Sequence, residues 1–368
     1  MKTLLKAKAM DESGLLNDQN LKSIVLWMPN WIGDVVLTLP ALQSLRRAYP
    51  KIHITVVVKP PSNELLLGHP AVSKVISLPS DSESTIWKRI KFALNLKKYQ
   101  FDLGVVFPNS FESAFLLSLT GAKHRLGYST DGRSIFLTCP IFTNTYLKKS
   151  QYRVEYFFKI FSPLRLDAPD PIFCPAVKQE DDISIREALL NMEIGENEEF
   201  ITIHPGTSKV ERSWHAERFG VLCQKIFKKD KKKMVLLGTQ SEKELLIRIK
   251  SCCPPGEIKV APAMNLRVLA GLIKKSQLFI GNDSGVMHLA AMVGTPVVGI
   301  FGPGHPNTTG PFMAPEKQEI LTKKYSCSPC RQRFFRECKP SPHNKPYCLE
   351  DITVEDVYEA IHRLLQRL

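Results

Sequence analysis

A polar turn between an apolar strand and a helix, within residues 278–303, has the composition of a phosphate-binding site. The segment is LFIGNDSGVMHLAAMVGTPVVGIFGP, in which the turn NDSG follows the strand directly. At such a junction the free backbone N–H groups and the positive end of the helix dipole attract an anion. The residues expected to face that ligand are Asp283, Ser284, Gly285 and, one turn into the helix, His288.

A purely structural interpretation of this turn stays open, in which Asp283 or Ser284 caps the helix and His288 packs in the core. A carboxylate beside a phosphate repels it unless the carboxylate binds sugar or ribose hydroxyls, so Asp283 favours a nucleotide-sugar as the ligand. The commoner nucleotide motifs are missing from the sequence. It has no GxxxxGK(S/T), no GxGxxG after its first strand, and no Asp-x-Asp for a metal-bridged pyrophosphate.

Positively charged side chains would have to replace such a metal, and the segment HPGTSKVERSW at residues 204–214 supplies them. It follows an expected strand and offers the hydroxyls of Thr207 and Ser208. It also contains Arg212, whose guanidinium can bind two phosphate oxygens at once. The alternative is a polar loop that only leads into a helix near His215.

A second carboxylate, Asp34, follows the first expected strand in the segment NWIGD, at the sheet edge where open α/β sheets bind ligands. As a general base it would take a proton from an attacking hydroxyl. As an N-cap or first-turn acid it would only stabilise the helix dipole. Its position is compatible with both roles.

Four of the nine cysteines form a C-x2-C-x7-C-x9-C series, which consists of Cys327, Cys330, Cys338 and Cys348 and encloses His343. Structural zinc sites usually have two closely spaced pairs, and here only the first pair is close. Five basic residues surround the series. The pattern favours a basic surface loop with packed cysteines, and metal binding or disulfide formation remains the alternative.

These segments alternate as apolar strands and amphipathic helices, a rhythm that predicts parallel sheets. The expected strands include residues 23–28, 54–58, 103–107, 200–204, 234–237, 278–280 and 297–301, and the expected helices include 216–227, 241–250, 266–274 and 286–292. We predict an α/β protein with two doubly wound, Rossmann-like domains that face each other. The ligand would bind between the carboxyl ends of the two sheets.

The 368 residues suffice for two domains. The predicted parts are a polar leader (1–20), a first domain (21–165), a proline-containing linker (166–185), a second domain (186–352) with a basic cysteine-containing insert near 325–348, and a C-terminal amphipathic helix (353–368).

The net charge of +14 indicates an anionic partner, which would be a nucleic acid, a phosphorylated ligand or an acidic membrane surface. Basic runs such as residues 88–91 and 228–233 are poorly interleaved with aromatic residues, and no RNA-binding signature is present, which disfavours nucleic acid. The chain has no secretory signal, no apolar span and few cysteines. We therefore expect a protein of a reducing compartment that touches a membrane without crossing it.

Three segments carry a resemblance to a known family: PNWIGDVVLTLPAL at 29–42, HPGTS with RSW within 204–214, and GNDSGVMHLAA at 281–291. Together they resemble the lipopolysaccharide heptosyltransferases of glycosyltransferase family 9. FPNSFESA at 107–114 and HRLG at 124–127 look most like the heptosyltransferase II branch. The resemblance covers about residues 22–320. It implies a GT-B fold with an N-terminal acceptor domain, a C-terminal donor domain and a last helix that often crosses back.

The implied activity is an inverting, metal-independent transfer of heptose from ADP-L-glycero-D-manno-heptose to the inner core of lipopolysaccharide. The resemblance implies no cofactor. A lipid-linked acceptor implies peripheral contact with the cytoplasmic face of the inner membrane.

By similarity, Asp34 corresponds to the general base of the family. The implied donor-binding residues are Thr207, Ser208, Arg212, Glu242, Met264, Asp283, Ser284, Gly285 and His288. Among them Glu242 would hold the ribose and Met264 would contact adenine. The family often has lysine at position 212, and arginine keeps that charge. The implied acceptor-side residues are Asn109, Ser110, Ser113 and Arg125.

Two other functions remain as alternatives. The first is a GT-B transferase with another nucleotide-sugar or acceptor, because a few hydroxyl contacts decide which sugar a pocket accepts. The second is a non-catalytic protein bound to an acidic membrane surface, which would have no need for Asp34, Arg212 and Asp283 together.

Overall fold

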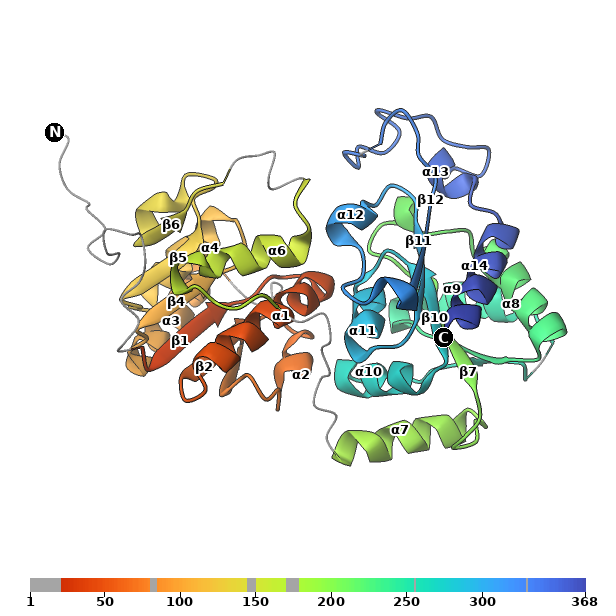
Figure 1. Cartoon of the computed structure of the whole chain (residues 1–368), viewed down its shortest axis with the longest axis horizontal. Helices are drawn as coiled ribbons and strands as arrows, with labels where there is room; N and C mark the ends of the chain where they lie inside the picture. Colours follow the sequence, from red (N-terminus) through yellow and green to blue (C-terminus); the bar gives the residue numbers. More distant parts are fainter. Residues whose placement is uncertain (1–20, 80–84, 144–149, 170–178, 255, 329) are drawn as a thin grey trace. The chain divides into compact units, whose positions relative to one another are not determined.

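The computed structural model describes residues 21–79, 85–143, 150–169, 179–254, 256–328 and 330–368 (Figure 1). The chain divides into two compact units, Met1–Asp170 and Pro171–Leu368. The predicted polar leader, residues 1–20, lies outside the described residues.

Unit 1 contains a six-stranded sheet in the order β3-β2-β1-β4-β5-β6, with every neighbouring pair parallel. Its strands are β1 (Ser23–Trp27), β2 (His53–Val58), β3 (Lys74–Ser77), β4 (Leu103–Val106), β5 (His124–Tyr128) and β6 (Cys139–Ile141). The central strands are buried almost throughout, which is why they are continuous apolar runs rather than alternating ones.

The described helices of unit 1 lie between these strands in the chain, except α6, which follows β6. They are α1 (Ile32–Ala48), α2 (Asn63–Leu66), α3 (Ile86–Asn95), α4 (Phe111–Leu119) and α6 (Arg153–Phe158), with 3-10 turns η1 (Leu96–Tyr99), η2 (Arg133–Phe136) and η3 (Lys159–Leu164). Arg46 lies in the last turn of α1. Its guanidinium donates to the carbonyls of Pro50 and Ile52 at 2.9 and 2.8 Å. These bonds fix the turn into β2.

Unit 2 has the same architecture, with strand order β12-β11-β10-β7-β8-β9. Its strands are β7 (Phe200–His204), β8 (Lys233–Leu236), β9 (Ile258–Val260), β10 (Leu278–Asn282), β11 (Val297–Phe301) and β12 (Gln318–Thr322). Its helices are α7 (Gln179–Asn191), α8 (Ala216–Asp230), α9 (Lys243–Lys250), α10 (Leu266–Lys275), α11 (Gly285–Val293), α12 (Pro306–Thr309), α13 (Tyr347–Glu350) and α14 (Val354–Arg367), with η4 (Val210–Arg212), η5 (Gln240–Glu242) and η6 (Pro315–Lys317).

In each sheet the direction of strand addition reverses at one place. In unit 1 the reversal lies between β1 and β4, and in unit 2 it lies between β7 and β10. The loops after two such strands diverge to opposite faces of the sheet, which opens a crevice at the carboxyl edge where α/β proteins bind ligands. The segments singled out in the sequence follow these four strands.

The predicted α/β class with two doubly wound parallel sheets is confirmed. Two details differ from the expectation. Residues 179–185, expected as linker, form the start of α7, where Asp181 lies 3.2 Å from Arg267 of α10. The C-terminal helix α14 packs on α8 and β12, within unit 2 (Figure 1). Across the described parts of the chain, no helix combines the length and apolarity needed to cross a membrane.

The burial pattern of unit 2 predicts how two equal truncations differ. Leu236 of β8 is fully buried in the core, whereas Leu190 of α7 is 72% exposed. We expect Leu236→Ala to lower the free energy of unfolding by about 2–5 kcal/mol, because it removes buried methyl groups and leaves a cavity. Leu190→Ala should change it by less than about 0.5 kcal/mol. Urea unfolding of both variants measures the difference, and similar losses would contradict this core assignment.

Candidate active site

The centre of the unit 2 site is the junction of β7 and β10, where His204 and Gly281 are register partners. Asn282 connects the two segments that follow these strands. Its Nδ2 donates to the carbonyl of Pro205 at 2.6 Å, and its Oδ1 accepts from the backbone N–H of Trp214 at 3.0 Å. The last residue of β10 is therefore bonded to both ends of the loop 205–214.

Arg212 and Asp283 form an ion pair across this junction. Arg212 Nη2 donates to the Asp283 carboxylate and, at 3.2 Å, to its carbonyl. The Nε atom of Arg212 is buried and has no hydrogen-bond partner among the described residues. The guanidinium thus retains a donor that an anionic ligand can engage.

The pair changes the expectation for Asp283. The Asp283 side chain is 6% exposed, and the positive charge of Arg212 lies beside it. That charge reduces the repulsion expected between this carboxylate and a phosphate. Asp283 is not the cap of α11. The N-cap residue is Ser284, whose side chain makes no capping bond and whose Oγ lies 3.3 Å from His204 Nδ1. Gly285 is the first residue of the helix.

His288 is buried within α11, as its structural interpretation predicted. Burial lowers the pKa of its imidazole to about 4, although the Asp283 charge acts in the opposite direction. The ring is therefore neutral at pH 7. Its Nδ1 lacks a hydrogen-bond partner within the described parts of the chain, and a role in donor binding stays a prediction.

Thr207 and Ser208 lie in the loop just before η4, the turn that carries Arg212. Thr207 Oγ1 accepts from the backbone N–H of Lys209 at 3.3 Å, and Ser208 is exposed. The three predicted phosphate-binding residues therefore all lie in the loop between β7 and α8.

Glu242 has a structural role that its sequence position did not reveal. Its Oε2 accepts from the backbone N–H and the hydroxyl of Thr239 at 2.8 and 2.9 Å, in a capping box. Its Oε1 lies against Gly206, where an added Cβ would approach it to 1.6 Å. Glu242 therefore borders the same loop. Met264 is half-buried and lies in the loop that connects β9 to α10.

In unit 1, Asp34 lies in the first turn of α1, and the N-cap residue is Trp31. Asp34 Oδ1 is 3.9 Å from Arg153 Nε at the start of α6. Burial raises the pKa of Asp34, and the Arg153 charge partly offsets this rise. Of the two structural alternatives for Asp34, the N-cap is excluded and the first-turn position is observed.

Asn109, Ser110 and Ser113 form a group after β4, beside the same reversal of strand order. Ser110 caps α4 by accepting from the backbone N–H of Ser113 at 3.2 Å. Asn109 Nδ2 donates to the Tyr156 hydroxyl at 2.9 Å. A cavity of about 240 Å³ opens here, and its lining includes Ser110, Ser113, Asn30, Lys59 and Arg89.

Arg125 does not join this group. It lies near the amino end of β5, at the opposite edge of the sheet. Its guanidinium donates to the carbonyls of Phe136 and Ala122 at 2.6 and 2.8 Å, and so holds local backbone. Its acceptor role stays a prediction that the site geometry does not support.

Sequence analysis missed three residues of the unit 1 site. Arg133 is fully buried and donates to the Tyr128 carbonyl at 2.7 Å and to Asn109 Oδ1 at 3.3 Å. Arg153 and Tyr156 reach the site from α6, more than 40 residues after β4. None of the three stands in a motif, and only tertiary packing brings them to the site.

Comparison with known protein families adds the decisive observation. Residues 89–339, more than half of the chain, match glycosyltransferase family 9 (heptosyltransferase). The chain belongs to this family. It is a heptosyltransferase, as the resemblance in its motifs predicted.

Two curated relatives are similar to this heptosyltransferase over most of its length. Lipooligosaccharide heptosyltransferase 2 of Haemophilus ducreyi is 27% identical over 361 residues, which cover 93% of this chain and 99% of the relative. Lipopolysaccharide heptosyltransferase 1 of Pseudomonas aeruginosa is 25% identical over 319 residues, with coverages of 84% and 86%.

Solved structures confirm the GT-B fold. The E. coli ADP-heptose LPS heptosyltransferase II superposes with a TM-score of 0.75 at 22% identity, covering 94% of this chain and 99% of that one. A family 9 glycosyltransferase from Veillonella parvula has a TM-score of 0.82 at 22% identity, with coverages of 94% and 98%. At these identities the likeness concerns the fold.

The four cysteines of the insert in this heptosyltransferase are free, half-buried thiols. Burial, followed by the neighbouring Cys330, Cys327 and Cys338, raises the pKa of Cys348 to about 12, so this thiol is protonated at neutral pH. Within the described residues, no group of three or more His, Cys, Asp or Glu side chains is arranged to hold a metal ion.

The ion pair of Asp34 predicts a pH effect. If Asp34 is the general base, as the resemblance implies, the acid limb of kcat/KM follows its pKa, because a general base works only when ionised. Arg153→Met removes the charge that lowers this pKa, and we expect the acid limb to move to higher pH. The control is Lys123→Met, which also removes a cation from a unit 1 ion pair, with Asp102. An unmoved acid limb in Arg153→Met would refute the coupling.

Proposed function

We propose that this heptosyltransferase transfers heptose from ADP-L-glycero-D-manno-heptose to the inner core of lipopolysaccharide, and that it adds the second heptose. Family membership makes the chain a heptosyltransferase. The observation that carries the donor assignment is Arg212, a cation at the β7/β10 reversal whose side chain is 20% exposed and whose Nε lacks a partner among the described residues. Such a group suits a diphosphate.

The proposed donor site lies in unit 2. Arg212 with the hydroxyls of Thr207 and Ser208 would bind the diphosphate, and the amino end of α11 at Ser284 and Gly285 would add backbone N–H donors. The remaining donor residues would be Glu242 at the ribose, Met264 at the adenine, and Asp283 and His288 in the turn after β10.

The proposed acceptor site lies in unit 1, beside Asn109, Ser110 and Ser113. Asp34 would take the proton of the acceptor hydroxyl, and the oxygen would attack the anomeric carbon on the face opposite to ADP. The new C–O bond forms as the bond to the diphosphate breaks, so the configuration inverts and ADP leaves with the electron pair. Arg212 and the helix end would stabilise the charge that develops on the diphosphate.

Transfer of the second heptose is supported by the segments 107–114 and 124–127 and by the relative named heptosyltransferase 2. A similarly related protein is named heptosyltransferase 1, so the acceptor must be tested directly. The alternatives are a different acceptor or nucleotide-sugar on the same fold.

The direct test is the release of ADP from ADP-heptose, with and without a mono-heptosylated inner-core acceptor, in the presence of a chelator. We expect acceptor-dependent release by the wild type. Asp34→Asn should lower kcat by about 10²- to 10⁴-fold, the range of general-base catalysis. It should leave the affinity for ADP nearly unchanged.

Two comparisons control this test. Arg212→Gln should weaken ADP binding, whereas Arg248→Gln, which breaks an exposed pair with Glu217, should not. Release with a heptose-free acceptor alone would reassign the protein to the first heptose. Turnover of Asp34→Asn at the wild-type rate would remove Asp34 from the mechanism, and absent donor binding would refute the proposed function.

We also propose peripheral contact with the acidic cytoplasmic face of the inner membrane, through α3. Trp87 and Leu94 are 75% and 39% exposed on this helix, and Lys91 is exposed between them. The three lie at positions i, i+7 and i+4, so they share one face. Exposed aromatic and basic residues on one helix face suit a lipid interface, and Arg89 of the same helix lines the unit 1 cavity.

Vesicle binding tests this contact. The double variant Trp87→Ser/Leu94→Ser should bind less to phosphatidylglycerol-containing vesicles, because it loses apolar contacts with the lipid. Added salt should weaken wild-type binding, because it screens the attraction between basic side chains and anionic lipid. Leu190→Ser, at a leucine of α7 that is 72% exposed, is the control. Unchanged vesicle binding by the double variant would exclude α3 as the contact surface.

A further inference from the structure

The loop that carries Arg212, residues 205–214, is held internally by the side chains of Thr207 and Ser213 and by its turn η4. The turn η4 contains two backbone bonds, from Arg212 N to Lys209 O at 2.9 Å and from Ser213 N to Val210 O at 3.1 Å. The Val210 side chain is 74% exposed. A loop outside the sheet loses its conformational freedom only if other parts of the molecule hold it.

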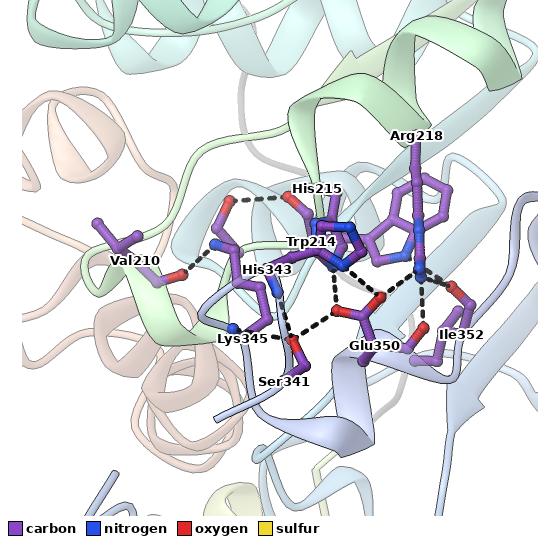
Figure 2. Close-up of polar contacts among 10 residues, drawn as sticks. Val210, Trp214, His215, Arg218, Ser341, His343, Lys345, Glu350 and Ile352 are labelled. Atoms are coloured by element: carbon purple, nitrogen blue, oxygen red, sulfur yellow. Dashed lines mark hydrogen bonds and ion pairs between the residues drawn. The ribbon is translucent and has the colours of Figure 1, made fainter. Parts of the chain in front are cut away.

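The end of the cysteine-containing insert and the two residues after it, together residues 341–350, approach this loop (Figure 2). The Lys345 ammonium donates to the Val210 carbonyl at 2.7 Å, two residues before Arg212. Ser341 fixes the turn that presents Lys345: its backbone N–H donates to the Lys345 carbonyl at 2.8 Å, and its Oγ accepts from the Lys345 N–H at 3.2 Å. The insert thus reaches the loop from a rigid turn.

Glu350, the last residue of α13, joins the insert to the start of α8 (Figure 2). On the insert side its carboxylate accepts from Ser341 Oγ at 2.8 Å and from His343 Nδ1 at 3.0 Å. On the other side it accepts from Arg218 Nη2 at 2.7 Å and lies 3.0 Å from His215 Nε2. Groups from two distant segments therefore converge on one carboxylate that is 12% exposed.

The charge of Glu350 is maintained by these partners. Burial alone would raise its pKa, but the hydrogen bond from Ser341 and the charges of His215 and Arg218 hold the pKa below the usual range. Glu350 is therefore ionised at neutral pH, and hydrogen bonds to an ionised acceptor are the stronger kind.

The held segment leads directly to the proposed donor site. Trp214 precedes His215 and donates its backbone N–H at 3.0 Å to Oδ1 of Asn282, the last residue of β10. Its indole Nε1 donates to the Ile352 carbonyl at 2.8 Å, two residues after Glu350. The insert end and the donor turn are thus bonded to the same short stretch of chain.

We propose that Glu350 and Lys345 are positioning residues of the donor site. They hold residues 209–218 in place, so that Arg212 stays beside Asp283 and presents its guanidinium to the diphosphate. This inference rests on the proposed function, because it takes the Arg212 loop as the donor site. It gives the insert a part in donor binding although neither residue need touch the donor.

The test is calorimetric titration of the full-length protein with ADP, together with steady-state kinetics. We expect Glu350→Gln to weaken ADP binding by at least about 10-fold, because small displacements of a positioned binding group have large effects. Lys345→Met should act in the same direction. The KM for ADP-heptose should rise with the ADP dissociation constant, while kcat at saturating donor and the KM for the acceptor change by less than about twofold. Glu350→Asp, which keeps the charge, should restore part of the ADP affinity.

The matched control is Glu319→Gln in the same unit. Glu319, like Glu350, is a partly buried carboxylate that accepts from basic side chains, here Arg367 at 2.6 Å and Arg363 at 3.4 Å. It is 19% exposed and lies on β12. It should leave ADP affinity unchanged.

Four outcomes would overturn the inference. If folded Glu350→Gln and Lys345→Met bind ADP with wild-type affinity, the inference is wrong but the proposed donor site stands. The same holds if Glu319→Gln loses as much ADP affinity as Glu350→Gln. A loss confined to kcat would also contradict positioning of the donor. A wild-type protein that binds no ADP would refute the proposed donor site and this inference with it.

Discussion

A buried carboxylate needs a positive partner, and at the end of β10 that requirement falls on Asp283. Arg212 meets it from a loop 71 residues earlier in the chain. The pair therefore bonds the two segments that diverge from the β7/β10 reversal. The anion site that we propose is formed by the donors that Asp283 leaves unused, so the buried pair and ligand binding depend on the same guanidinium.

Unit 1 contains a similar pair of a carboxylate and an arginine, but its two charged groups lie farther apart. Asp34 follows β1, the first strand of its sheet, and faces an arginine from the later helix α6, but the two are 3.9 Å apart and the pKa of Asp34 is raised. In unit 2 the Arg212 guanidinium donates directly to the Asp283 carboxylate. A looser pair leaves a carboxylate basic enough to accept a proton, which agrees with the proposed role of Asp34.

The contacts of the cysteine-containing insert give it a structural role that its sequence did not predict. Its basic residues and its four cysteines suggested a peripheral surface loop. Its last residues instead contribute Glu350 and Lys345, which bond the chain on both sides of Arg212. The bonds between these segments are polar and short, so they fix direction as well as distance. We therefore regard the end of the insert as part of the framework of the proposed donor site.

The fold and the principal loops were predictable from local signals. Continuous apolar runs ending in polar turns indicate buried parallel strands, and helix-forming segments between them indicate crossovers, because both patterns depend on nearest neighbours in the chain. The loop with Arg212 and the turn with Asp283 follow such strands, so they were predicted as candidates without any tertiary information.

The sequence by itself therefore determined the α/β class, the family and the loops that carry the candidate residues. The partners of those residues were decided only by the tertiary structure. Arg153 and Arg133 reach the unit 1 site, and Glu350 and Lys345 reach the Arg212 loop, from segments with no motif of their own. Arg125 lies at the other edge of its sheet. Which charges meet depends on the packing of segments that are far apart in the chain, and local sequence patterns do not encode that packing.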